Sequence, residues 1–201
     1  MSADGKIALP SRKPIQLSNL EDSKRVTELR KKCDAILVGI GTILEDNPKL
    51  TIKGNNDLKK NPTRIVLDTN GRTPLESNVL DPEAKTIIAV GNGCKIKKLK
   101  KSEIIRCGEG RVNIKLLLEK LSEIGIKRIL VEGGETVLWS FLSEKLFDEL
   151  NIFIASTIIG GENTPTVAGG IGFSTKLETL DLSLERVQKL GNGVLLTYHN
   201  I

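Results

Sequence analysis

Six short apolar runs constrain the fold more than any other feature of this sequence. They are AILVG at 35–39, RIVLD at 64–68, TIIAV at 86–90, EIIRC at 103–107, RILVE at 128–132 and NIFIA at 151–155. Each run is rich in Ile or Val and alternates little between apolar and polar residues, which is typical of strands that are covered on both faces. The sequence therefore predicts a largely parallel, buried sheet.

Helical patterns precede or separate several of these runs. Ser18 and Glu21 have the spacing of a capping box, and the apolar residues that follow recur at helical intervals as far as Cys33. In the segment 113–125, Asn113 is a candidate helix cap and Gly125 is placed to end the helix. A third helix is predicted within 136–146. This alternation indicates a layered α/β domain with helices on both faces of the sheet.

The C-terminal segment has a different pattern. LSLERVQKL at 182–190 is followed by Gly191-Asn192-Gly193 and by VLLTYH at 194–199. Two strand-like runs joined by such a turn predict an antiparallel hairpin, which we expect to lie against the parallel sheet. Because no repeat or linker interrupts the chain, residues 1–201 are expected to form a single domain.

The composition argues against several functional classes. No apolar run approaches the ~20 residues of a membrane-spanning helix, and aromatic residues at 3% are too few for a surface that stacks nucleic-acid bases. The three cysteines are odd in number and form no C-x-x-C motif, which argues against disulfides and a zinc site and favours the cytoplasm. His199 is the only histidine, so a histidine metal site is not expected. The basic run GCKIKKLKK, 93–101, is expected to be a solvated loop or edge.

Two glycine-containing turns follow predicted strands and are candidate ligand sites. Thr42 and Asp46 lie one helical turn apart after the strand that ends at Gly39, which would place both side chains where open α/β sheets bind ligands. In RILVEGGETVLWSFL, 128–142, a strand enters a helix through two glycines, an arrangement whose backbone amides and helix dipole can hold a phosphate. Taken alone, either turn can equally be a tight connection without a ligand.

Three basic residues are weaker candidates for anion binding. Arg72 follows a predicted strand end and can hold the 2′-phosphate that distinguishes NADP from NAD, or it can be a solvated loop residue. Lys6 can pair with an anion, although a lone lysine is usually solvated. Arg30 can do the same, or it can stabilise the C-terminus of its own helix.

Taken together, the motifs resemble a known enzyme family. MSADGKIA, GIGTILEDNPKLT, RIVLDTNGRTP, ILVEGGETVLWSFL and the final LGNGVLLTYH occur in the order seen in the reductases of riboflavin biosynthesis, and the chain is most similar to their stand-alone archaeal form. The resemblance implies a dihydrofolate-reductase-like α/β fold, a homodimer and NADPH as cofactor, with NADH possible. It also implies that the ribosyl group of a phosphorylated diaminopyrimidine is reduced to a ribityl chain by hydride transfer to C1′.

The resemblance also implies which residues form the site. The cofactor would be contacted by Thr42, Asp46, Arg72, Thr73, Pro74, Leu75, Val112, Gly133, Gly134, Glu135 and Thr136, and the substrate by Lys6, Ser18, Arg30, Leu50, Lys53 and Glu132. Asp46 would be the catalytic residue that handles the proton, Arg30 and Lys53 would face the 5′-phosphate, and Glu132 would hold sugar hydroxyls. The side chain of Glu135 is expected to face solvent.

Alternatives remain open at this stage. The substrate can be the diaminopyrimidine or its deaminated analogue. Two other functions also fit the chain: a pterin or pyrimidine reductase of the same fold, or a non-catalytic protein that binds NADPH or a nucleotide. Relatives generally carry one more strand before the segment that starts at Met1 here. Either this chain lacks that strand or its true start lies upstream of this methionine, and we expect the second.

Overall fold

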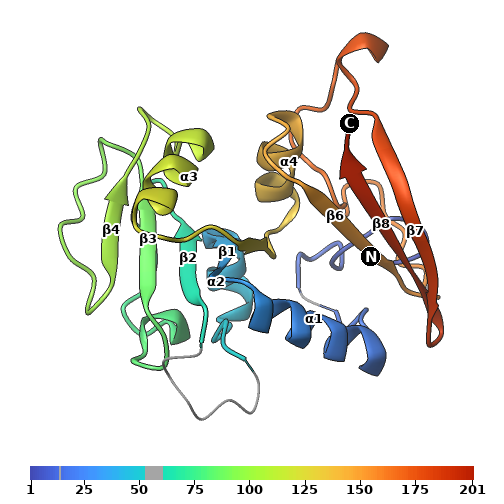
Figure 1. Cartoon of the computed structure of the whole chain (residues 1–201), viewed down its shortest axis with the longest axis horizontal. Helices are drawn as coiled ribbons and strands as arrows, with labels where there is room; N and C mark the ends of the chain where they lie inside the picture. The colour runs from blue at the N-terminus through green and yellow to red at the C-terminus, as the bar shows by residue number, and fades with distance from the viewer. Residues whose placement is uncertain (14, 53–60) are drawn as a thin grey trace. The chain divides into compact units, whose positions relative to one another are not determined.

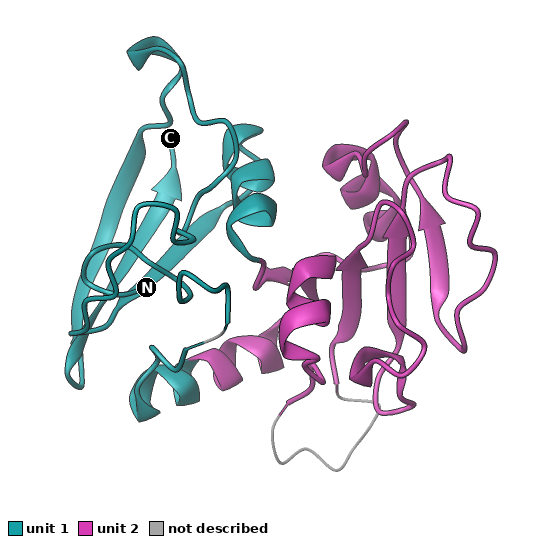
Figure 2. Ribbon diagram, turned by 180° about the vertical axis from the view of Figure 1, so that it is seen from behind, with its two compact units in different colours: residues 1–25, 134–201 teal, residues 26–133 magenta. Residues whose placement is uncertain are grey.

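The computed structural model describes residues 1–13, 15–52 and 61–201. They form two compact units, one of residues 26–133 and one of residues 1–25 with 134–201 (Figure 2). We call the first unit the parallel-sheet unit and the second the antiparallel-sheet unit. The helix α1, Leu20–Lys32, contributes residues to both. That the whole chain is one domain stays a prediction, because two compact units can still belong to one folding domain.

The parallel-sheet unit contains five parallel strands in the order β4-β3-β2-β1-β5 (Figure 1). Each strand lies at one of the predicted apolar runs, and β1 and β3 match their runs residue for residue. Their bounds are β1 Ala35–Gly39, β2 Thr63–Leu67, β3 Thr86–Val90, β4 Glu103–Arg106 and β5 Ile129–Val131. The predicted parallel, buried sheet is therefore confirmed for these five runs.

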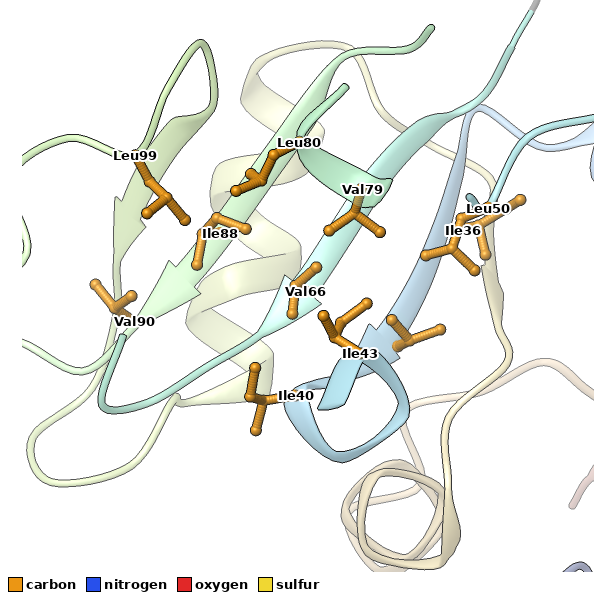
Figure 3. Packing of buried hydrophobic residues seen from close by; sticks show 11 residues of the cluster. Ile36, Ile40, Ile43, Leu50, Val66, Val79, Leu80, Ile88, Val90 and Leu99 are labelled. Carbon is orange, nitrogen blue, oxygen red and sulfur yellow. The ribbon is translucent and has the colours of Figure 1, made fainter. Parts of the chain in front are cut away.

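Helical segments cover both faces of this sheet, as predicted. The helix α2, Ile40–Asp46, and the short 3-10 helix η2, Asn78–Leu80, place apolar side chains in a core cluster with those of β1, β2 and β3 (Figure 3). The helix α3, Ile114–Glu123, lies on the other side of the strands and buries Ile114, Leu117 and Leu121. A fully buried aliphatic side chain contributes roughly 1.5–3 kcal/mol relative to an exposed one, so these two layers stabilise the parallel sheet.

One charged side chain lies inside this core. Arg64 of β2 is fully buried, and its guanidinium donates hydrogen bonds to Thr86 Oγ1 at 2.9 Å, to Asp81 Oδ1 at 2.8 Å and to backbone carbonyls that include those of Asp81 and Ala84. A buried charge is tolerated only when its hydrogen-bonding groups are satisfied. Arg64 therefore ties the segment that follows η2 to the sheet.

The helix ends agree with the sequence in one case and differ in another. Asn113 caps α3 by accepting a hydrogen bond from the Leu116 amide, and Gly125 follows the helix with φ +86°, both as predicted. The predicted cap of α1 was wrong. Asn19, not Ser18, accepts from the Asp22 amide, because the Ser18 hydroxyl donates to the Asp22 carboxylate instead.

The antiparallel-sheet unit contains the helix α4, Glu135–Ser143, the short 3-10 helix η3, Lys176–Glu178, and three strands in the order β6-β8-β7. Their bounds are β6 Glu149–Ile154, β7 Leu182–Leu190 and β8 Gly193–Asn200. The predicted hairpin is confirmed, with Leu190 paired to Gly193 across its turn.

The placement of the sixth apolar run differs from the prediction. β6 pairs antiparallel with β8 and not with a strand of the parallel sheet. The hairpin accordingly completes this second sheet. A short apolar run reports burial but carries no information on the direction of its partner, which is why the sequence pattern did not separate β6 from the other five runs. Within the described ranges, no helix has both the length and the apolar character needed to cross a membrane.

Candidate active site

The carboxyl ends of the five parallel strands lie on one edge of the sheet, and open α/β sheets bind ligands at this edge. The helix α2 follows β1 directly, so the sequence prediction that Thr42 and Asp46 lie on a short helix after a buried strand is confirmed. The segments that follow the strands are α2 after β1, 68–75 after β2, 91–95 after β3, 107–112 after β4 and 132–133 after β5. Most of the residues predicted to contact a cofactor lie in them.

Thr42 is half-buried and Asp46 is exposed, at the last residue of α2. Desolvation by the surrounding protein atoms, and then the neighbouring carboxylate of Glu45, raise the pKa of the Asp46 carboxyl above its ordinary value. A raised pKa favours the protonated acid, which is the form that can donate a proton. Asn47 follows in the left-handed region at φ +42° and ends the helix.

The loop after β2 is fixed by Asp68. This buried carboxylate accepts hydrogen bonds from both the amide and the hydroxyl of Thr73, each at 2.7 Å through Oδ2. Its Oδ1 is buried and, among the described atoms, has no partner. Arg72, between the two, is exposed. Thr73 thus supports the loop through its side chain, while the guanidinium of Arg72 faces outward, as do the exposed Pro74 and Leu75.

Arg30 and Glu132 form the best-defined polar contact at this edge. Arg30 Nε donates to Glu132 Oε1 at 2.8 Å and Nη2 donates to Oε2 at 2.6 Å, while Nη1 reaches the Thr51 carbonyl at 3.2 Å. The hydrogen bonds to Glu132 raise the pKa of Arg30. The two side chains remain 25% and 21% exposed, so each keeps hydrogen-bonding groups that a ligand can reach. Two of the residues predicted for the substrate therefore lie together.

The other predicted residues of this unit are placed less directly. Leu50 is buried in the core cluster and adopts φ +52°, so only its backbone is available to a ligand. Val112 is half-buried in the segment before α3, and Gly133 follows Glu132 after β5. Lys53 lies outside the described residues.

The residues predicted at the start of α4 belong to the antiparallel-sheet unit. Gly134 is the cap residue of α4, and Thr136 is exposed in its first turn. The expectation that the side chain of Glu135 faces solvent was wrong. Its carboxylate accepts a hydrogen bond from Arg12 at 3.0 Å, and a Cβ atom on Gly169 would come within 2.9 Å of its side chain. Gly169 leaves room for Glu135, which is why this acid is held at the helix start.

Lys6 and Ser18, both predicted for the substrate, also belong to the antiparallel-sheet unit. The Lys6 backbone amide donates to Ser2 Oγ, whose hydroxyl donates to Asp4. That bond and the backbone amides of 159 and 160 lower the pKa of Asp4 to about 2. The ionised Asp4 carboxylate thereby holds Ser2, whose hydroxyl oxygen in turn accepts from the Lys6 amide. The Ser18 hydroxyl is engaged by Asp22, as described above.

Several structural partners of the site were not predicted. Arg12, Asp68 and the Thr51 carbonyl each hold a predicted residue, and the loop of Gly91–Lys95 lies beside the loop after β2. For Asp68, its place as the acid that ends an apolar run was a usable signal. For the other partners no local signal exists, because their contacts join segments that lie far apart in the chain.

Comparison with known proteins identifies close relatives. Residues 1–196 match the protein family described as the RibD C-terminal domain. The chain is 39% identical, over 98% of its length and 93% of the relative's, to the 2,5-diamino-6-ribosylamino-4(3H)-pyrimidinone 5′-phosphate reductase of Archaeoglobus fulgidus. It is 38% identical to the protein of the same name from Methanothermobacter thermautotrophicus, over 98% of this chain and 94% of that one.

Solved structures show the same fold. The chain superimposes with a TM-score of 0.84 on RibD of Acinetobacter baumannii at 23% identity, where all of this chain covers 56% of the larger protein. The riboflavin biosynthesis reductase Rib7 of Saccharomyces gives a TM-score of 0.75 at 24% identity, with 86% of that chain covered. Dihydrofolate reductase from Enterococcus faecalis, complexed with NADP(H), gives 0.50 at 11% identity, with 92% of it covered. These likenesses establish a dihydrofolate-reductase-like α/β fold.

Proposed function

Because the chain belongs to the family of RibD C-terminal domains, we propose that it is the reductase of riboflavin biosynthesis that acts on 2,5-diamino-6-ribosylamino-4(3H)-pyrimidinone 5′-phosphate. The reaction converts the ribosyl group to a ribityl chain. We propose NADPH as the reductant, a homodimer as the working form and the cytoplasm as its location. The observation that carries the proposal is the similarity to reductases of this name along 98% of the chain.

The described residues fit a dinucleotide cofactor. Gly39 and Gly41 lie at the start of α2, Gly91 follows β3 and Gly133 follows β5, so backbone can approach a ligand closely along the whole carboxyl edge of the parallel sheet. Arg72 stands exposed on the same edge and supplies a cation for a phosphate. When bound, NADPH would supply the hydride.

The protein's own groups would position the substrate and manage the proton. Opening of the sugar ring breaks the bond from C1′ to the ring oxygen, the oxygen takes up a proton, and C1′ accepts the hydride. Asp46, whose pKa is raised, would hold the proton that this step requires. Holding the two reactants in a fixed orientation would lower the activation barrier of hydride transfer by several kcal/mol. This is less than the roughly 7–11 kcal/mol reached in the best-oriented intramolecular reactions.

Arg30 and Glu132 would bind the substrate as a pair. A guanidinium that is already oriented by a carboxylate can offer its remaining N–H groups to a phosphate without first losing its own rotational freedom. The free acceptor positions of Glu132 suit sugar hydroxyls. Lys6, Ser18, Leu50 and Lys53 remain further candidates for substrate contacts.

Purified protein incubated with NADPH and the diaminopyrimidine substrate tests the function. We expect the absorbance band of the reduced nicotinamide to decay only when both are present, and a product of the mass of the ribityl compound. The deaminated analogue serves as the matched substrate. Faster reduction of the analogue would reassign the substrate, and no decay with either compound would reject the proposed function. Light scattering coupled to gel filtration would test the dimer.

A further inference from the structure

A pocket of about 400 Å³ lies at the amino-terminal edge of the parallel sheet, opposite the edge that carries the proposed active site. It opens where β2, β3 and β4 begin and beside the residues that follow α3. Its volume lies in the range of small-molecule sites. Among the described residues, none that is proposed to contact the cofactor or the substrate lines this pocket. The proposed reaction therefore leaves the pocket unexplained.

Part of the lining is apolar. Ile124 and Ile126 line the pocket directly after α3, and Ile87 of β3 lines it as well. Between the first two, Gly125 adopts φ +86°, and the Ile126 amide donates to the Leu121 carbonyl at 3.0 Å, so the chain reversal after α3 is fixed. Ile124 is nevertheless 53% exposed. A ligand that covers it would remove apolar surface from water, which favours binding.

Two lysines line the same pocket from neighbouring strands. Lys85 directly precedes β3, and Lys101 lies two positions before β4. Because Ile87 of β3 pairs with Glu103 of β4, the two lysines hold corresponding positions along strands that lie about 4.8 Å apart. Both side chains are exposed. Like charges at such positions repel each other, so this arrangement is unfavourable in the absence of an anion.

The two lysines lack acidic partners. Within the described part of the chain, neither takes part in an ion pair, whereas Lys100 between the two strands lies 3.8 Å from Glu76. Glu103, an exposed acid that lines the pocket, forms no ion pair with a described residue either. The hydroxyl of the half-buried Thr63 has no hydrogen-bond partner among these residues, so it can donate to a ligand. An anion between the lysines would be attracted by both and would offset their repulsion.

The turn before β4 fixes the position of Lys101. The Ser102 amide donates to the Leu99 carbonyl at 3.0 Å, and the Ser102 hydroxyl donates to the same carbonyl. Lys100, inside this turn, adopts φ +49°, a conformation that costs a non-glycine residue of the order of 1–3 kcal/mol. Such strain persists only where the surrounding structure determines the backbone, and it is concentrated at ligand sites. The strained turn therefore sets the direction in which Lys101 leaves the chain.

We propose that this amino-terminal pocket binds a small organic phosphate, with the phosphate group between Lys85 and Lys101. The apolar part of the ligand would lie against Ile124 and Ile126, and the Thr63 hydroxyl would donate to a phosphate oxygen. A phosphate monoester carries a charge of about −1.5 to −2 at pH 7, which matches two ammonium groups. The five residues of β3 span about 16 Å, so this ligand and the substrate would bind at opposite ends of the strands without competing. The inference does not depend on the proposed function.

Calorimetric titration of the full chain with phenyl phosphate, inorganic phosphate and phenol tests the proposal. We expect phenyl phosphate to bind more tightly than either of the other two. Lys85→Ala and Lys101→Ala should each weaken it about tenfold, the effect of losing one hydrogen bond to a charged group. Lys97→Ala is the matched control, since Lys97 is an exposed lysine of the same basic run that does not line the pocket. Equal weakening by Lys97→Ala, or none by the other two variants, would overturn the site.

A second variant tests the apolar part of the pocket. Ile124 is largely exposed, so Ile124→Ala should fold. We expect it to weaken phenyl phosphate about fourfold, the loss of roughly one buried methylene group, and to leave inorganic phosphate unchanged. Equal affinities of phenyl phosphate for Ile124→Ala and the parent would reject an organic ligand and leave an adventitious ion only. Turnover of the diaminopyrimidine substrate, measured in parallel, should be the same in all these variants, and a chain without turnover that binds phenyl phosphate through Lys85 and Lys101 would refute only the reaction.

Discussion

The pairing of Arg30 with Glu132 leads to a quantitative prediction, because α1 also carries a second ion pair for comparison. Arg30 and Glu132 share two hydrogen bonds and are about three-quarters buried. Lys31 and Glu28 form a single contact at 2.7 Å with side chains 49% and 61% exposed. The two pairs thus differ in geometry and burial while sharing one helix.

Double-mutant cycles measure the two coupling energies. A hydrogen bond to a charged group contributes roughly 1.5–3 kcal/mol, and an exposed ion pair contributes roughly 0.2–1 kcal/mol. Since the Arg30–Glu132 pair is bidentate but partly exposed, we expect a coupling of about 1.5 kcal/mol between Arg30→Met and Glu132→Gln. For Lys31→Met and Glu28→Gln we expect about 0.3 kcal/mol.

Urea unfolding of the single and double variants of each pair provides the assay. Repeating it at 1 M salt, where the screening length falls to about 3 Å, should remove most of the Lys31–Glu28 coupling and less of the other. A coupling for Arg30–Glu132 that does not exceed that for Lys31–Glu28 would refute the view that this pair is pre-oriented for a ligand.

Three further predictions follow from single residues. Asp46→Asn should lower kcat about 10²- to 10⁴-fold. Glu45→Gln removes a neighbouring charge that raises the Asp46 pKa, so it should leave kcat near its maximum and shift the alkaline limb of the pH–rate profile to lower pH. An unshifted limb would exclude Asp46 as the acid. The folded-state pKa of Asp4 is lowered to about 2, so the stabilisation from its carboxylate is complete above the unfolded-state pKa and is lost as pH falls through about 2. In guanidinium unfolding, Asp4→Asn should therefore be less stable than the parent at about pH 6 and equally stable at about pH 1.5, below both pKa values. Arg64→Met should cost about 3–5 kcal/mol of unfolding free energy, because the buried Thr86 and the partly buried Asp81 lose their donor. Arg111→Met at an exposed position should change it by less than about 0.5 kcal/mol. Similar midpoints for the two variants would argue against a structural role for Arg64.

The strands of the parallel sheet could be predicted because both of their faces are buried. Burial on two faces enriches a run in Ile and Val whatever its partners are, so β1 and β3 are visible in the sequence alone. The same signal marked β6 as a strand but carried no information on its direction. Its antiparallel partner β8 lies about forty residues further along the chain and is specified by packing.

Helix ends were predictable where the capping group has no competing partner. Asn113 caps α3 as its residue type suggests. At α1, Ser18 has an equally suitable side chain but bonds to Asp22, and Asn19 takes the cap while also donating to the Leu190 carbonyl in the hairpin. That second bond depends on tertiary structure, which a local pattern cannot include.

The elements that carry the predicted site residues could be predicted from the sequence, whereas the contacts of these residues could not. Thr42 and Asp46 lie where their spacing places them, because both belong to one short helix. Arg30 and Glu132 are 102 positions apart, and Glu135 meets Arg12 across 123 positions. The pocket lined by Lys85 and Lys101 likewise requires that β2, β3 and β4 be neighbours, which is a property of the sheet order.

Isotope transfer tests the proposed reaction most directly. The protein would be incubated with the diaminopyrimidine substrate and NADPH carrying deuterium at both hydrogens of nicotinamide C4, and the product examined by mass spectrometry and NMR. The account predicts a ribityl product with one deuterium, located at C1′, and much slower formation of this product by Asp46→Asn. Unlabelled product, or deuterium at any other carbon, would contradict hydride transfer to C1′.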